Sequence, residues 1–195
     1  MHMPMLEHEL ILGGQKSGKS RRAEQRAIAW LAEAPATRRA VLIATGQAHD
    51  DEMRERIARH QADRAQRVPD MRTVEEPVEL AREIVTQSAA DTLVVIDCLT
   101  LWLTNLLMPL RSESARPITR TPATHVAMLL VALREARGPV VLVGNEIGLG
   151  VIPLGGETRA FVDALGRLNQ DVAAACGRVT LMVAGLPLTL KAPAT

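Results

Sequence analysis

Five short apolar runs constrain the fold of this 195-residue chain more than any other feature of its sequence. Each run is rich in Val, Ile, Leu or Ala and nearly continuous, which is typical of strands buried on both faces of a parallel sheet. The runs are ELILGG (9–14), AVLIAT (40–45), TLVVIDC (92–98), VVLVGN (140–145) and VTLMVAG (179–185). MRTVEE (71–76) is a weaker candidate strand, and LPLTLK (186–191) is expected to form the second arm of a final hairpin.

Amphipathic stretches with helical spacing separate the strands. They cover roughly residues 19–33, 50–66, 77–88, 99–107, 122–137 and 158–176. This alternation predicts a three-layer α/β fold with right-handed crossovers and a mostly parallel sheet. Residues 108–122, rich in Pro, Ser, Thr and Arg, are expected to form a long surface loop.

The first strand leads into the strongest local motif, GGQKSGKS, which fits the Walker A pattern G-x-x-x-x-G-K-[ST]. A strand before the motif and a helix after it provide the context that the pattern requires. Its glycines let backbone N–H groups converge on phosphate oxygens, Lys19 reaches the β- and γ-phosphates, and the Ser20 hydroxyl ligates Mg²⁺. We therefore expect residues 1–195 to form one P-loop NTPase (RecA-like) domain that binds a nucleoside triphosphate.

Asp97 ends the most apolar run of the chain and is the candidate for the second magnesium ligand. A P-loop site needs a carboxylate at the tip of another strand. The alternative is that Asp97 caps the helix predicted over 99–107.

A polar helix after the second strand carries a histidine whose position raises a question of function. Asp50, Asp51 and Glu52 load its first turn with negative charge, as the helix dipole favours. His60 shares a face with Met53 and Ile57, on a helix that starts at the carboxyl end of a strand. It is either a solvated surface histidine or an imidazole that reaches nucleotide phosphates. Spacing alone does not choose between His60 and His49.

A second polar cluster follows the strand at 140–145. Asn145 and Glu146 end that strand, and a loop rich in Gly and Pro follows. The next helix carries Arg159, Asp163 and Arg167 at four-residue spacing, with Asn169 beyond them. The spacing is consistent with a ladder of surface ion pairs, or with a surface that binds a substrate or another subunit.

Composition excludes several classes of function. The formal net charge is +1 and the chain has only two Trp, one Phe and no Tyr, so neither a basic surface nor stacking aromatics indicate nucleic acid binding. The sequence shows neither a signal peptide nor an apolar run of about twenty residues, which predicts a cytoplasmic protein without membrane contact. Cys98 and Cys176 are far apart and are expected to be free thiols.

Together these stretches resemble the bifunctional adenosylcobinamide kinase/adenosylcobinamide-phosphate guanylyltransferase family of cobalamin synthesis. The resemblance covers nearly the whole chain and rests on GGQKSGKS, IATGQAHDDEMRERIARH, VVIDCLTLWLTNLL, VGNEIGLGVIPLGGETRAFVDALGRLNQ and VAGLPLTLK. In GGQKSGKS, Lys16 stands where the form associated with the family has Arg, and it keeps that positive charge.

The resemblance implies a covalent mechanism. In this family a histidine on the helix after the second strand attacks the α-phosphate of GTP, and GMP then passes to adenosylcobinamide phosphate to give adenosylcobinamide-GDP. The histidine that matches the family's R-I-x-x-H pattern is His60, which with Lys19 forms the implied catalytic pair. The family also phosphorylates adenosylcobinamide with ATP or GTP.

The resemblance also implies the remaining site residues. Those expected to contact the nucleotide are Gly13, Gly14, Gln15, Lys16, Ser17, Gly18, Lys19, Ser20, Thr45, Gly46, Gln47 and either Glu75 or Glu76. Mg²⁺ is expected at Ser20 and Asp97. A corrinoid substrate and a homotrimer with sites between subunits are implied as well. The alternatives are a P-loop small-molecule kinase without a covalent histidine, and a non-catalytic nucleotide-binding protein.

Overall fold

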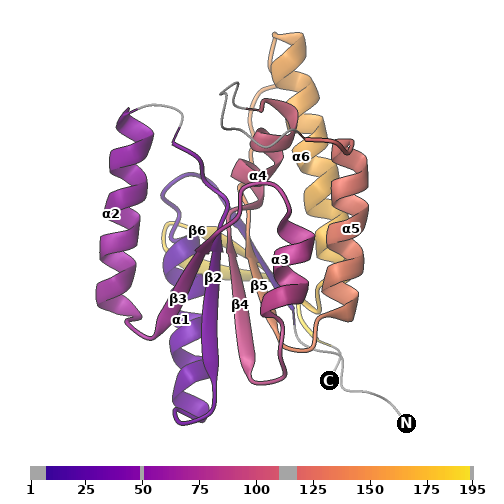
Figure 1. Ribbon diagram of the computed structural model, residues 1–195. Coiled ribbons are helices and arrows are strands. Elements are labelled where there is room, and N and C mark those ends of the chain that lie inside the picture. The colour runs from indigo at the N-terminus through magenta and orange to yellow at the C-terminus, as the bar shows by residue number, and fades with distance from the viewer. Residues whose placement is uncertain (1–7, 49–50, 110–117, 194–195) are drawn as a thin grey trace.

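The computed structural model describes residues 8–48, 51–109 and 118–193 as a seven-stranded sheet between two layers of helices (Figure 1). The strands are β1 (Glu9–Gly13), β2 (Arg39–Ala44), β3 (Met71–Glu75), β4 (Thr92–Asp97), β5 (Val140–Val143), β6 (Arg178–Val183) and β7 (Leu186–Lys191). The helices are α1 (Lys19–Glu33), α2 (Asp51–Arg67), α3 (Leu80–Gln87), α4 (Leu99–Leu107), α5 (Pro122–Glu135) and α6 (Gly156–Ala175). The predicted three-layer α/β fold is confirmed.

The strand order across the sheet is β3-β2-β4-β5-β1-β6-β7. All neighbouring strands run parallel except β6 and β7, which are antiparallel and form the expected final hairpin. β5 lies between β1 and β4, so the loops after these three strands meet at one edge of the sheet. Open α/β sheets bind ligands at the carboxyl ends of their parallel strands, so the functional site is expected at this edge.

Two apolar clusters hold the layers together, one on each face of the sheet. Ala23 and Ala27 of α1 pack on one face, where short side chains let the helix approach the strands closely. Ile84, Leu129 and Leu168 bring α3, α5 and α6 against the other face. Figure 1 shows α1 and α2 on one side of the sheet and α3, α5 and α6 on the other. Because both faces are covered, the central strands are apolar throughout rather than alternating.

His8, directly before β1, is buried among these layers and predicts a pH-dependent stability. Its Nε2 donates to the Leu133 carbonyl at 2.8 Å, and its Nδ1 accepts from the Val140 N–H at 3.1 Å, which is the pattern of a neutral ring. Burial lowers the pKa of His8, partly offset by the bond to Leu133. The unfolded chain therefore binds the proton more readily, and stability falls as the pH drops below about 6.5, the ordinary histidine value.

The measurement is the free energy of unfolding from urea titrations at several pH values between 7 and 5. We expect a steeper decrease in the wild type than in His8→Gln, because glutamine has no proton to gain. The exposed His60 provides the matched control as His60→Gln, which should keep the wild-type slope. Equal slopes in wild type and His8→Gln would contradict the assignment.

Candidate active site

The GGQKSGKS segment forms a loop between β1 and α1, as predicted. Gly13 and Gly18 have positive φ angles of 151° and 99°, which glycine adopts without strain. Lys16 also has a positive φ, of 56°. Gly14, Gln15 and Lys16 are exposed at the tip of the loop, and α1 begins at Lys19. The loop therefore presents backbone and a helix N-terminus to the carboxyl edge of the sheet, as phosphate binding requires.

Lys19 is only 8% exposed and its Nζ donates to the Gly14 carbonyl at 2.6 Å. The ammonium group thus lies inside the loop and not in solvent. Ser17 is also buried, and among the described residues its hydroxyl has no hydrogen-bond partner. The Gly185 N–H, in the turn between β6 and β7, donates to the Ser17 carbonyl at 3.1 Å. The final hairpin therefore braces the loop, a role that sequence analysis missed because the contact joins opposite ends of the chain.

Gly13→Ala tests this packing. An added Cβ would lie 2.5 Å from the Met182 carbonyl oxygen and 2.6 Å from the Ser17 hydroxyl oxygen, so the loop must move. We expect a loss of about 1–3 kcal/mol in unfolding free energy, together with weaker nucleotide binding. Gly14→Ala is the matched control for the unfolding free energy, because its Cβ would meet nothing within 4 Å. Urea unfolding measures the loss of stability and isothermal titration with GTP the loss of binding in Gly13→Ala, and equal unfolding free energies of the two variants would contradict the packing argument.

Asp97, at the end of β4, lies beside the start of α1. Its Oδ2 accepts from the Ser20 hydroxyl at 3.3 Å, so the two predicted magnesium ligands are brought together. The alternative that Asp97 caps α4 is wrong, because Cys98 occupies the N-cap position and α4 has no side-chain cap. The peptide bond between Asp97 and Cys98 is cis.

Thr45 is fully buried, and its hydroxyl forms hydrogen bonds with the turn after β4. The hydroxyl donates to the Cys98 carbonyl at 2.7 Å and accepts from the Cys98 N–H at 2.9 Å. Asn105 of α4 donates to the Thr45 carbonyl at 2.7 Å, an anchor that sequence analysis did not identify. Gly46 and Gln47 are half-buried, so they form the more accessible part of this turn.

His60 is exposed on α2, and none of the contacts described for this structure joins it to residues 13–20. Ile57, on the same face, lies near Gly46, since a Cβ at that glycine would be 3.7 Å from the Ile57 Cδ1. Gln61 donates to Glu75 at 3.2 Å. The His60 face of α2 is therefore tied to the ends of β2 and β3. His49 lies outside the described residues.

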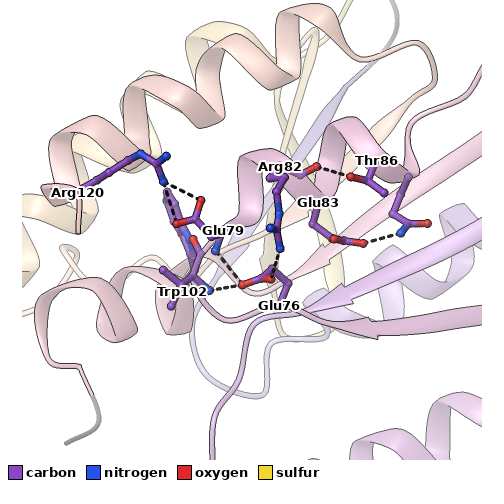
Figure 2. Close-up of polar contacts among 9 residues, drawn as sticks. Glu76, Glu79, Arg82, Glu83, Thr86, Trp102 and Arg120 are labelled. Atoms are coloured by element: carbon purple, nitrogen blue, oxygen red, sulfur yellow. Dashed lines mark hydrogen bonds and ion pairs between the residues drawn. The ribbon is translucent and has the colours of Figure 1, made fainter. Parts of the chain in front are cut away.

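The two candidate guanosine contacts differ in their surroundings. Glu76 is buried, and its Oε1 accepts from the N–H groups of Val78 and Glu79, at 3.0 and 2.8 Å, directly before α3. Its Oε2 pairs with Arg82 at 3.6 Å (Figure 2). Glu75 is exposed, and its described hydrogen bond is the one to Gln61. Glu76 is thus used to start α3, while Glu75 faces α2.

The tip of β5 lies between the P-loop and Asp97. The Glu146 N–H donates to the Gly13 carbonyl at 3.1 Å, and the Asn145 N–H donates to the Thr100 hydroxyl at 2.8 Å. Asn169, buried on α6, donates to the Asn145 carbonyl at 3.1 Å. The polar cluster identified after 140–145 is therefore attached directly to the phosphate loop.

Both cysteines are buried free thiols, as predicted. Burial raises the pKa of Cys98 to about 11, with a further contribution from Asp97, and burial raises the pKa of Cys176 to about 12. Thiols in this state are poor nucleophiles, because the thiolate is the reactive form.

Comparisons with known proteins agree with these features. Residues 9–190 match the family described as cobinamide kinase / cobinamide phosphate guanyltransferase. The bifunctional adenosylcobalamin biosynthesis protein CobP of Pseudomonas aeruginosa is 46% identical over 186 residues, covering 94% of this chain and 96% of that protein. CobU of Salmonella typhimurium, with the same description, is 36% identical over 188 residues and covers 93% and 98%.

The fold also resembles a solved structure of distant sequence. The flagellar accessory protein FlaH from Methanocaldococcus jannaschii superposes with a TM-score of 0.51 at 9% identity, over 96% of this chain and 79% of that one. At this identity the likeness concerns the fold alone. In the part of the chain that the structure describes, no helix has the length and apolar character needed to cross a membrane.

Proposed function

The chain is an enzyme of the cobinamide kinase / cobinamide phosphate guanyltransferase family, and from this premise we propose that its P-loop serves two successive transfers. In the first, the γ-phosphoryl group of ATP or GTP passes to the aminopropanol hydroxyl of adenosylcobinamide. In the second, GMP from GTP passes to the resulting phosphate and gives adenosylcobinamide-GDP.

The arrangement of Lys19, Ser20 and Asp97 at one edge of the sheet supports this proposal most directly. Lys19 is held inside the loop, where its charge is more effective than in water because the surrounding dielectric is lower. It would neutralise negative charge on the β- and γ-phosphates as either transfer proceeds. The backbone N–H groups of the loop and the α1 N-terminus would hold the same oxygens.

The residues around Asp97 fit Mg²⁺. Ser20 and Asp97 supply two hard oxygen ligands 3.3 Å apart. The described residues contain no group of three His, Cys, Asp or Glu side chains that would form a complete protein cage. Mg²⁺ typically takes one or two protein ligands and completes its octahedron with water and phosphate oxygens. When bound, it would supply positive charge to the phosphates that Lys19 also contacts.

His60 is proposed as the nucleophile of the guanylyl transfer. A ring nitrogen forms a bond to the α-phosphorus while the bond to the pyrophosphate oxygen breaks, and pyrophosphate leaves. A phosphate oxygen of the corrinoid substrate then attacks the same phosphorus, and the P–N bond breaks to restore the imidazole. His60 is exposed and the two thiols are buried, so the histidine is the better placed of these nucleophiles. Bound GTP must bridge the P-loop and α2 for this step.

Glu75 is proposed as the residue that favours guanine. Guanine presents N–H donors that a carboxylate accepts, and the exposed Glu75 lies beside α2 through its bond from Gln61. Glu76, the other candidate, uses both carboxylate oxygens within the chain.

A homotrimer, expected from the resemblance, is proposed for the assembly. Val183, Leu186, Leu188 and Leu190 on the edge hairpin are 55–71% exposed. An apolar edge strand of this kind is typical of a covered surface, because an open edge invites pairing. The same hairpin contacts the P-loop through Gly185, so a neighbouring subunit there would lie close to the nucleotide. The cytoplasmic location stays a prediction.

Product analysis tests the proposed function. The chain is incubated with adenosylcobinamide, Mg²⁺ and either ATP or GTP. The corrinoid products are then separated and identified by mass spectrometry. We expect adenosylcobinamide phosphate with ATP or GTP, and adenosylcobinamide-GDP with GTP. Phosphate product alone would indicate a plain P-loop kinase. Nucleotide binding without any corrinoid product would indicate a non-catalytic protein.

A further inference from the structure

A pocket of about 640 Å³ opens between α6 and the loop that follows β5. Its volume lies within the range of about 300–1,000 Å³ that is usual for small-molecule sites. Its apolar lining consists of Ile147, Val151 and Ile152 on the loop and Val162 on α6. Val151 is 96% exposed and Ile152 76% exposed, which is unusual for branched apolar side chains.

The polar lining consists of Asp163, Arg167 and Gln170 on α6. The possible ladder of ion pairs along this helix does not form, since Asp163 and Arg167 have no ion pair with any residue that the structure describes. Arg159 instead donates to the carbonyls of Pro153 and Leu154, at 2.9 and 2.7 Å, and so holds the loop to the helix. Arg167 is exposed at the pocket, and its guanidinium is available to pair with an anion there.

Gly166 lies in the middle of α6 and lines the same pocket. Glycine inside a helix is less stable than alanine by roughly 0.5–1 kcal/mol. Nothing in the fold requires it here, because a Cβ at this position would meet no atom within 4 Å. The missing side chain leaves room that a ligand can occupy.

The loop and the helix that line the pocket are both bonded to the strand tip beside the P-loop. Ile147 directly follows Glu146, whose N–H bonds the P-loop carbonyl of Gly13 at 3.1 Å. Asn169, on the pocket helix, anchors the Asn145 carbonyl at the same strand tip. The pocket is therefore built on segments that are attached to the phosphate loop through Glu146 and Asn145.

We propose that this pocket binds the phosphate-bearing arm and the adjoining ring edge of the corrinoid substrate, an inference that rests on the proposed function. The ring edge combines apolar carbon with carboxamides, which suits a lining that holds apolar side chains together with Gln170 and Asp163. Arg167 pairs with the phosphate, since a guanidinium fork matches phosphate oxygens in two parallel hydrogen bonds. Gly166 provides the space for the ring edge.

Equilibrium dialysis against adenosylcobinamide phosphate and unphosphorylated adenosylcobinamide tests the pocket assignment. The visible absorbance of the corrinoid measures the bound fraction. Arg167→Gln should weaken binding of adenosylcobinamide phosphate by about 10- to 100-fold. It should weaken binding of unphosphorylated adenosylcobinamide by less than about threefold. Arg167→Lys should restore part of the loss, because it keeps the charge without the fork. Arg134→Gln on α5, an exposed arginine outside the pocket, should bind both like the wild type.

Filling the pocket provides the second test. Gly166→Leu should weaken binding of both corrinoids by about tenfold or more, because the side chain occupies the space of the ring edge. Ala160→Leu adds the same side chain at an exposed position of α6 outside the pocket and should leave binding unchanged. Gly166→Ala should keep or raise the thermal stability, which shows that the position tolerates a side chain.

The outcomes separate this inference from the proposed function. Unchanged corrinoid dissociation constants in Arg167→Gln and Gly166→Leu would overturn the pocket assignment, even if the wild type makes both products. If light scattering shows that these variants differ from the wild type in particle mass while their corrinoid affinity is unchanged, the assignment is also overturned. That result would indicate that a second copy of the chain fills the pocket. Failure of the proposed function has a separate signature, the absence of corrinoid products from the wild type.

Discussion

Lys19→Ala is expected to lower both the kinase and the guanylyltransferase activity by about 100- to 1,000-fold or more, as removal of one preorganised charge-stabilising group typically does. The reason is that, in the proposed mechanism, both transfers place developing negative charge on phosphates held by the same loop. Lys19 is 8% exposed with its Nζ 2.6 Å from the Gly14 carbonyl, so its charge is held in a fixed position inside the loop. The measurement is kcat/KM for each half-reaction, with ATP and adenosylcobinamide for one and GTP and adenosylcobinamide phosphate for the other.

Lys191→Ala is the matched control for this variant. Its ammonium contacts the Ala173 and Ala174 carbonyls at the end of α6, at 3.0 and 3.3 Å, far along the chain from the P-loop. It should retain both activities, and thermal unfolding of both variants shows that the fold is kept. Retention of either activity by Lys19→Ala within a few-fold of wild type would mean that this transfer does not use the P-loop.

The second large effect is expected for His60→Ala. Guanylyl transfer should fall by at least about 1,000-fold, since loss of the covalent nucleophile in other enzymes lowers kcat by up to about a million-fold. Phosphorylation of adenosylcobinamide should stay within about tenfold of wild type, because the proposed kinase step uses Lys19, Ser20 and Asp97 and forms no bond to histidine. Pyrophosphate release with GTP and adenosylcobinamide phosphate, measured beside ATP consumption with adenosylcobinamide, separates the two.

Arg59→Ala changes the neighbouring exposed side chain on α2 and serves as the control for His60→Ala. It should leave the covalent step intact. Equal losses of both activities in His60→Ala would indicate a structural effect on α2. Normal guanylyl transfer in His60→Ala would exclude His60 as the nucleophile and move the assignment to His49.

Much of the fold could be predicted because its signals are local. Each buried parallel strand is a continuous apolar run between Gly, Asp or Asn, and the β1-P-loop-α1 unit carries both glycine spacing and helix pattern within a few residues. The predicted helices at 19–33 and 99–107 match α1 and α4 at both ends. The meeting of Ser20 and Asp97 could also be predicted, because P-loop chemistry requires an acid at a second strand tip.

The rest depends on contacts between distant segments, which leave no local pattern. The sequence does not distinguish Glu75 from Glu76 as a guanosine contact, and the structure shows that the N–H groups of Val78 and Glu79 donate to the carboxylate of Glu76. The resemblance implies that Thr45 contacts the nucleotide, and the structure shows that its hydroxyl donates to the carbonyl and accepts from the N–H of Cys98, 53 residues away. The spacing of Arg159 and Asp163 permits an ion pair, but the Pro153 and Leu154 carbonyls compete for the arginine.

The central claim is a covalent guanylyl group on His60, and labelling with GTP radioactive at the α-phosphate tests it most directly. The wild type, His60→Ala and His49→Ala are incubated with the labelled GTP and Mg²⁺ and separated by denaturing electrophoresis. We predict a label that is labile in acid and stable in alkali, present in the wild type and His49→Ala and lost in His60→Ala. A wild type that binds GTP with magnesium present but retains no label after denaturation would contradict the account.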